Sequence, residues 1–197
     1  MTYSVFYIRV YQELDEQTLA RLCSEDDRQA KEELYTRYAA RLYALCCRYS
    51  GNRDDAEDLM QDTLITALDR ISTYRYMGKG SLYAWISRIA VNSAINRIKR
   101  HKLLFISFDR IHPDSIPEPS REDVSKISIE TLLEMISSLP DTQRALFNLY
   151  CIDNYSHKEI AGMLGISETG AASMLAKARA KLKKKIIEYI SNSEKNG

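Results

Sequence analysis

Three of the four prolines in this 197-residue sequence lie between Ile111 and Ser120, and this cluster limits how the chain can fold. Proline fixes one backbone dihedral angle and has no N–H to donate, so a regular helix cannot continue through several of them. The surrounding segment is also rich in acidic residues. We therefore predict an acidic, extended linker over residues 103–127, with a folded domain on each side of it.

Both sides of this linker repeat apolar residues at the three- and four-residue steps of amphipathic helices. The sequence contains only 7 glycines and 4 prolines, which favours long helices over many short strands. The expected fold is all-α, with two small helical domains joined by a flexible linker. The predicted parts are an extension over 1–12, a first domain over 13–102, the linker over 103–127, a second domain over 128–190 and a tail over 191–197.

Polar residues mark where the helices of the first domain should begin. Asp54 or Asp55 is the predicted cap of a helix that follows a break at residues 50–52. Ser81 is the predicted cap of the next helix, which should run to about His101. The loop between these two helices contains two glycines, two tyrosines and two basic residues.

Composition excludes several functional classes. Apolar residues make up 45% and charged residues 28% of the chain, which is typical of a soluble globular protein. No apolar run approaches the roughly 18 to 20 residues of a membrane span, and no signal peptide is recognised, so we expect a cytoplasmic protein without membrane insertion. The 4 cysteines form no CxxC pair and the 3 histidines have no ligand spacing, so neither a metal nor a cofactor is predicted. The sequence also lacks a nucleophile-and-base pair and a glycine-rich phosphate loop, so we do not expect an enzyme.

The net charge of +1 conceals an uneven distribution along the chain. Residues 1–62 carry −5 and residues 63–102 carry +7, whereas residues 103–144 carry −4 and residues 165–190 carry +4. Two basic blocks suit two separate DNA contacts, and the acidic blocks suit another partner. Solvated helix faces would give the same pattern, so charge alone does not decide between these interpretations.

The most specific motif runs from Ser156 to Ser167. Ser156 and Glu159 have the spacing of a capping box, which starts a helix. Gly165 comes where the chain must turn with a positive φ, and Ser167 can cap the helix that follows. Ala161 is small where a second helix must pass close by. This pattern predicts a DNA-binding helix-turn-helix, and the alternative is a plain helical hairpin.

The helix after this turn should enter the major groove by its amino-terminal end. Basic residues further along it suit phosphates, although a lysine run at a helix end also complements the helix dipole. The residues of this domain predicted to contact DNA are Ser156, Lys158, Ser167, Glu168, Thr169, Ala172, Ser173, Lys177 and Arg179.

With these motifs, the chain resembles the extracytoplasmic-function (ECF) group of sigma factors. Leu139–Leu149 and Gly165–Leu182 are similar to the pattern with which that family ends. Similar members read the −35 element of promoters with a four-helix domain that contains this helix-turn-helix. The resemblance implies the same fold and the same role here. Ala172 and Met174 stand where basic residues are common in the family.

The first domain resembles the other domain of the same family. Asp55–Leu64 is similar to the family segment that docks on the clamp helices of the polymerase β′ subunit. Polar residues three and four apart share one helix face, which suits a basic partner helix, although a solvated face would have the same spacing. The resemblance implies that the polymerase-binding residues are Asp55, Asp58, Gln61 and Asp62.

Gly80–Asn92 is similar to the family segment that, with the loop before it, recognises and opens the −10 element. Amides can bind base edges, basic side chains can hold phosphates, and loop tyrosines can stack on an unpaired base. Tyr83 and Trp85 are expected in the core instead. The residues predicted to contact the −10 element are Tyr74, Tyr76, Lys79, Arg88, Asn92, Asn96, Lys99 and Arg100.

The resemblance implies a sigma factor that directs core RNA polymerase to specific promoters and initiates transcription. The implied partners are the β′ clamp helices and the β flap of the polymerase, promoter DNA and an anti-sigma factor. The free protein is expected to be a monomer. One alternative is a helix-turn-helix regulator that acts without polymerase, which would need a sensing or dimerisation domain. The first half of the sequence has no pattern typical of such a domain.

Overall fold

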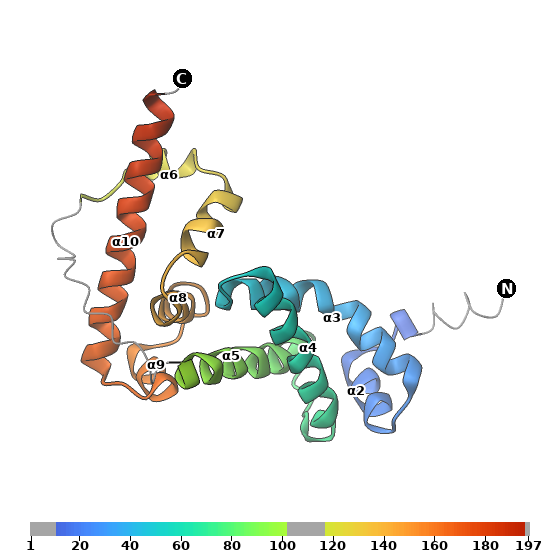
Figure 1. The fold of residues 1–197 in the computed structure, drawn as a ribbon. Helices are drawn as coiled ribbons and strands as arrows, with labels where there is room; N and C mark the ends of the chain where they lie inside the picture. The colour runs from blue at the N-terminus through green and yellow to red at the C-terminus, as the bar shows by residue number, and fades with distance from the viewer. Residues whose placement is uncertain (1–10, 102–116, 196–197) are drawn as a thin grey trace. The chain divides into compact units, whose positions relative to one another are not determined.

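The structure is a computed structural model that describes residues 11–101 and 117–195. Nearly all of the predicted extension over 1–12 and most of the predicted linker over 103–127 therefore lie outside the described residues. The regular elements within the described ranges are all helices, which confirms the all-α prediction (Figure 1). None of these helices is long and apolar enough to cross a membrane.

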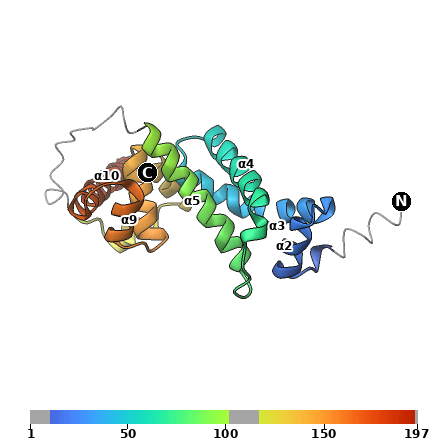
Figure 2. The ribbon, with the colours of Figure 1, turned by 90° about the horizontal axis from the view of Figure 1, so that it is seen from below.

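Within each of the two described ranges, the helices follow one another through short connections (Figures 1 and 2). Before residue 102 they are α2 (Glu16–Ser24), α3 (Arg28–Tyr49), α4 (Arg53–Asp69), a 3-10 turn (Ile71–Thr73) and α5 (Ser81–His101). After residue 116 they are α6 (Arg121–Ser125), α7 (Ile129–Ser137), α8 (Asp141–Phe147), a π-helical turn (Asn148–Ile152), α9 (His157–Leu164) and α10 (Glu168–Lys195).

The described residues form two compact units. The first contains the described residues up to Cys47 together with Asn52–Ala94. The second contains Arg48–Gly51 and the described residues from Ile95 onward. The boundaries predicted from sequence, 102 and 128, stay a prediction.

The core of the first unit consists largely of leucine and isoleucine side chains from several helices. Leu34 and Leu42 of α3, Leu59 of α4, and Leu82 and Ile86 of α5 are all at most 2% exposed. Burying a side chain of this size contributes roughly 1.5–3 kcal/mol. Leu82 and Ile86 lie four residues apart on one face of α5. Tyr83 and Trp85, which were expected in the core, are only partly covered.

The cap of α4 lies two or three residues earlier than predicted. Asn52, not Asp54 or Asp55, is the cap: its Oδ1 accepts a hydrogen bond from the backbone N of Asp55 at 2.8 Å. The Asp55 carboxylate in turn accepts from Asn52 Nδ2 at 2.8 Å. Asp54 and Asp55 lie in the first helical turn instead, where the helix dipole favours negative charge.

The first residue of α5 is Ser81, so the prediction that Ser81 caps this helix is wrong. Its hydroxyl is used elsewhere: Ser81 Oγ shares a hydrogen bond of 2.5 Å with the Tyr74 hydroxyl and accepts from Met77 N at 3.2 Å. The free N–H groups at this end of α5 are bound by the carboxylate of Glu16, the first residue of α2.

The second unit contains the four helices α7 to α10, with α6 before them. Its core includes Leu139, Leu146, Leu149, Ile160 and Leu175, each at most 2% exposed. The expectation of an extended chain throughout 103–127 is wrong at its end. The last proline of the cluster is Pro119, after which α6 forms at Arg121–Ser125 and Ile127 is buried. The predicted tail also differs, because α10 continues through residues 191–195.

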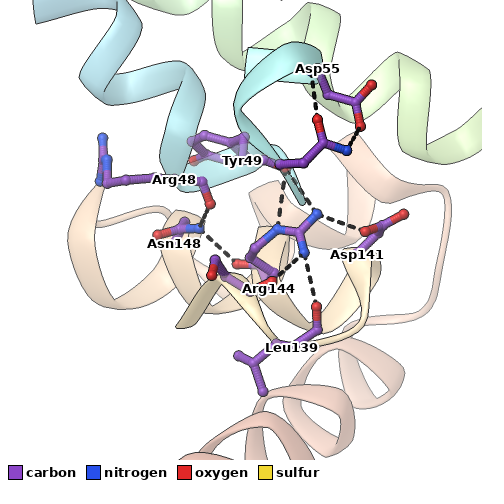
Figure 3. A network of polar contacts seen from close by, with 9 residues as sticks. Arg48, Tyr49, Asp55, Leu139, Asp141, Arg144 and Asn148 are labelled. Carbon is purple, nitrogen blue, oxygen red and sulfur yellow. Dashed lines mark hydrogen bonds and ion pairs between the residues drawn. The ribbon is translucent and has the colours of Figure 1, made fainter. Parts of the chain in front are cut away.

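A buried arginine fixes the corner between α7 and α8 (Figure 3). Arg144 is 3% exposed, and its Nη1 donates to the carbonyl oxygens of Ser137 and Leu139 at 2.8 and 2.9 Å. Its Nη2 donates to the Asp141 carboxylate at 2.6 Å. These bonds satisfy carbonyl groups that the end of α7 leaves without helical partners. The planar guanidinium therefore joins the two helices through several directed bonds.

Candidate nucleic-acid and partner interfaces

The helix-turn-helix of the second unit is built by local capping bonds. Ser156 Oγ accepts from Glu159 N at 3.3 Å, and the Glu159 carboxylate accepts from Ser156 N at 2.8 Å, which confirms the predicted capping box. Gly165 ends α9 with φ +65°, as the turn requires. Ser167 then caps α10 by accepting from Gly170 N at 3.0 Å. These bonds fix the start of α10 relative to α9.

The first turns of α10 leave a glutamate and three smaller side chains open to solvent. Glu168, Thr169, Ala172 and Ser173 are exposed, whereas Ala171 is fully buried between them. Ser156 and Ser167, which the sequence also placed among the DNA contacts, use their hydroxyls to cap helices in this structure. Small, exposed residues at a helix start allow the backbone to approach a groove closely.

The basic residues of the second unit are not equally available. Arg179 lies over the ring of Tyr150 at 5.3 Å, and its Nη2 donates to Cys151 Sγ at 3.7 Å. Lys183 is paired with Glu118, and Lys184 lies 3.8 Å from Glu188. Lys158 is exposed and Lys177 is half-buried. Of the two cations predicted on α10, Arg179 is the exposed one, and it already contacts Tyr150.

The outer face of α4 in the first unit is exposed and mostly acidic. At about 100° per residue, six of its exposed residues fall within about 120° of the helix circumference. We call this face the α4 stripe; it consists of Asp55, Asp58, Gln61, Asp62, Ile65 and Asp69. It contains the four residues predicted to bind a protein partner.

Ile65 is the apolar member of the α4 stripe and, like Asp69, was not among the residues predicted from sequence. It is 60% exposed, whereas Leu59 and Leu64 of the same helix are at most 5% exposed. Its spacing, four residues after Gln61 and three after Asp62, would have placed it on the same face. An exposed isoleucine surrounded by acidic groups resembles the apolar centre and polar rim of a protein interface.

The loop between α4 and α5 presents two large side chains to solvent and buries a third. Tyr76 is 43% exposed and Met77 is 88% exposed, whereas Tyr74 is only 8% exposed. The ring of Tyr74 packs 5.7 Å from that of Trp85, and burial raises the pKa of the Tyr74 hydroxyl. Tyr74 therefore belongs to the core of this structure and is not available to stack on a base. Met77 is the most exposed large side chain of this loop, and no sequence signal had identified it.

The exposed face of α5 carries the polar residues predicted from sequence. Arg88, Asn92 and Asn96 are exposed, and Lys99 is half-buried. Arg100 is exposed and donates from Nε to the Asn96 carbonyl at 3.4 Å. Lys79 is also exposed, in the loop before this helix. Amide and cationic side chains thus follow the loop along one helix, a combination that suits base edges and phosphates.

Two stretches of the chain match known sigma-70 regions. Residues 34–103 match Sigma-70 region 2, and residues 129–182 match Sigma-70 region 4. Region 2 thus covers α4, the loop and α5, and region 4 covers the helix-turn-helix. A chain that combines these two regions is a protein of the sigma-70 class.

Individual relatives narrow this class. The chain is 30% identical over 173 residues to the ECF RNA polymerase sigma factor SigM of Mycobacterium tuberculosis, covering 84% of this chain and 81% of SigM. It is also 30% identical over 168 residues to the ECF RNA polymerase sigma factor SigE of Mycolicibacterium smegmatis, covering 82% of this chain but 63% of SigE. The chain belongs to the ECF family of RNA polymerase sigma factors.

Two solved structures match this chain at lower identity. CnrH in complex with the cytosolic domain of CnrY is 20% identical, with a TM-score of 0.46, and the match covers 88% of this chain and 97% of CnrH. The sigma factor RpoE of Bartonella quintana, in complex with the anti-sigma factor NepR, is 20% identical, with a TM-score of 0.48, and the match covers 80% of this chain and 96% of RpoE.

Proposed function

We propose that this chain is a transcription initiation factor that recruits core RNA polymerase to promoters and catalyses no reaction of its own. The observation that carries the proposal is the α4 stripe, an exposed acidic face with an apolar residue at its centre, in a chain that also has a DNA-reading helix-turn-helix. An acidic face repels DNA phosphates, so it adds nothing to DNA binding by a polymerase-independent regulator. Its charge suits a basic protein surface.

The proposed partner of the α4 stripe is the pair of clamp helices in the polymerase β′ subunit. Asp58, Gln61 and Asp62 supply charged and polar contacts, and Ile65 supplies the apolar centre. Docking through one exposed helix face needs no rearrangement of the core beneath it, because Leu59 and Leu64 remain buried. The β flap of the polymerase is the proposed partner of the second unit.

The proposed promoter contacts are divided between α5, with the loop before it, and the helix-turn-helix. The loop before α5 and the exposed face of that helix bind and open the −10 element, through Tyr76, Met77, Lys79, Arg88, Asn92, Asn96, Lys99 and Arg100. The start of α10 reads the −35 element, through Glu168, Thr169, Ala172 and Ser173, with Lys158, Lys177 and Arg179 on phosphates. Ser156 and Ser167 hold the reading helix in position.

We further propose that the free protein is a cytoplasmic monomer held by an anti-sigma factor until transcription is required. Two of the solved relatives support this part of the proposal, because CnrH was solved with the cytosolic domain of CnrY and RpoE with the anti-sigma factor NepR. An anti-sigma factor that covers the α4 stripe would exclude polymerase by competing for the same face.

The experiment that tests the proposed function combines association with transcription. Core polymerase is mixed with the full chain, complexes are separated by size, and promoter-specific transcripts are mapped on genomic DNA. Asp58→Arg/Asp62→Arg should lower polymerase affinity by more than about tenfold, because it reverses two charges at the interface. Glu25→Arg/Glu32→Arg makes the same change in charge at two exposed ion pairs of the first unit and should leave affinity nearly unchanged. Tight sequence-specific DNA binding without any polymerase association would refute the proposal.

A further inference from the structure

A carboxylate from α2 closes the amino-terminal end of α5 across a separation of more than sixty residues. Glu16 Oε2 accepts hydrogen bonds from Gly80 N at 2.9 Å and from Leu82 N at 3.1 Å. Glu16 Oε1 accepts from the Tyr38 hydroxyl at 3.1 Å. Both oxygens of one side chain are therefore engaged, and one of them holds the end of the loop that precedes α5.

The end of α5 needs this external acceptor because it has none of its own. The first N–H groups of a helix have no partners within it. Gly80 has no side chain to offer, and the Ser81 hydroxyl is bonded to Tyr74 and Met77. A carboxylate also interacts favourably with the positive end of the helix dipole. Glu16 thus serves as the cap of a helix to which it does not belong.

The same contacts determine where the loop can lie. Gly78 and Gly80 have φ of +110° and +91°, so the loop passes through conformations that only glycine adopts easily. Its beginning is fixed by the bond between Tyr74 and Ser81, and its end by the bond from Gly80 N to Glu16. The exposed residues Tyr76 and Met77 lie between these two fixed points.

Glu16 is itself held from behind by the core of the first unit. Tyr38 is 3% exposed, and its ring stacks on that of Tyr83 at 6.0 Å. Burial and the neighbouring Glu16 carboxylate raise the pKa of the Tyr38 hydroxyl, so it remains a donor at neutral pH. The carboxylate is therefore oriented by a rigid group rather than by solvent.

We propose that Glu16 is a positioning residue for promoter opening: it holds the 74–80 loop in the conformation that captures unpaired bases of the promoter. The inference rests on the proposed function, because it assigns the loop to the −10 element. Glu16 contacts no DNA in this proposal. It acts through Gly80 and Leu82, and its loss weakens strand opening without weakening attachment to polymerase.

The test compares three variants of the full chain in complex with core polymerase. Opening is measured by permanganate reactivity of promoter thymines, and association is measured in parallel. Glu16→Ala should reduce opening by about tenfold, the effect of roughly one charge-assisted hydrogen bond, with association changed by less than about twofold. Glu16→Gln should retain most of the opening, because its Oε1 can accept both N–H groups while its Nε2 donates to the Tyr38 oxygen. Glu13→Ala, at an exposed neighbouring position, is the matched control.

A second readout on the free protein keeps the inference testable apart from transcription. Amide hydrogen exchange at Leu82 should be faster in Glu16→Ala than in the wild type and nearly unchanged in Glu16→Gln. Tyr38→Phe, which removes only the bond behind Glu16, should give a smaller loss of opening in the same direction.

The outcomes separate this inference from the proposed function. A wild type that opens promoters, with Glu16→Ala equal to it, overturns only the role of Glu16. Equal losses of association and opening in Glu16→Ala show a purely structural role and also overturn it. A wild type that neither binds polymerase nor opens promoters overturns the proposed function, and this inference with it.

Discussion

Two glycines of the helix-turn-helix occupy different surroundings, although both lie inside helices. A Cβ on Gly162 would meet no atom within 4 Å, whereas a Cβ on Gly170 would lie 2.9 Å from Ser167 Oγ. The first glycine is exposed on α9 and has no steric reason to be glycine. The second lies under the hydroxyl that caps α10. The sequence alone therefore does not show at which of the two positions the fold requires glycine.

We predict opposite effects on stability at these two positions. Gly162→Ala should raise the free energy of unfolding by roughly 0.5–1 kcal/mol, the usual gain of alanine over glycine in a helix. Gly170→Ala should lower it by up to about 1 kcal/mol, because the added methyl displaces the Ser167 cap. Denaturant unfolding of the full chain measures both. An equal gain at the two positions would show that the cap tolerates the methyl group.

The cysteines provide a pH-dependent prediction at the same scale. Burial raises the pKa of the Cys23 thiol from 9.0 to about 11, whereas Cys151 is exposed. At pH 8, iodoacetamide should modify Cys151 and leave Cys23 unmodified, because the thiolate is the reactive form. The stability gained by keeping Cys23 neutral is present below pH 9 and is lost as the pH rises toward 11. Mass spectrometry of digested protein identifies the modified residue, and early labelling of Cys23 would contradict the prediction.

At the scale of single elements, α4 combines a buried face with an exposed face of clear chemical character. Ile65 lies on the exposed face at 60% exposure, so it contributes little to the fold. Ile65→Ala should therefore lower polymerase affinity by about tenfold, as expected for a residue at the centre of an interface, and leave stability nearly unchanged. Tyr35→Ala, at a 53% exposed position of α3, is the control for removing a large exposed side chain. Equal effects of the two substitutions on affinity would exclude a specific role for Ile65.

The elements also differ in how far the sequence could predict them. The capping box of α9 and the cap of α10 were predictable, because each is made by residues within three positions of one another. The cap of α5 was not, because Glu16 is distant in sequence and becomes its partner only after folding. Tyr74 was assigned to the DNA surface for the same reason, since its packing on Trp85 leaves no local signal.

At the scale of the whole molecule, separate surfaces are proposed for separate steps of initiation. Asn92→Ala and Asn96→Ala should each impair strand opening and leave polymerase affinity unchanged within about twofold, because these exposed amides lie outside the α4 stripe. Asp58→Arg should lower polymerase affinity and leave strand opening by the assembled complex nearly unchanged. Binding assays and permanganate footprints of the single variants measure both quantities. Loss of polymerase association in the asparagine variants would show that α5 belongs to the docking surface.

The combined variant tests whether these surfaces act independently. If they do, the losses in transcription caused by Asp58→Arg and Asn92→Ala should multiply in the double variant, since non-interacting sites contribute additively to the free energy. If the double variant transcribes as well as the less active of the two single variants, both substitutions affect the same step.

The length of α10 has a practical consequence for anyone who attaches a probe to this protein. Its 28 residues, Glu168–Lys195, form one continuous helix of about 42 Å at 1.5 Å per residue. The proposed base contacts lie at its first turns, so a dye or a solid support joined beyond Lys195 would stand roughly 40 Å from them. Tethering by this end should leave promoter recognition intact in single-molecule measurements, where a tether at the opposite end of the helix would not.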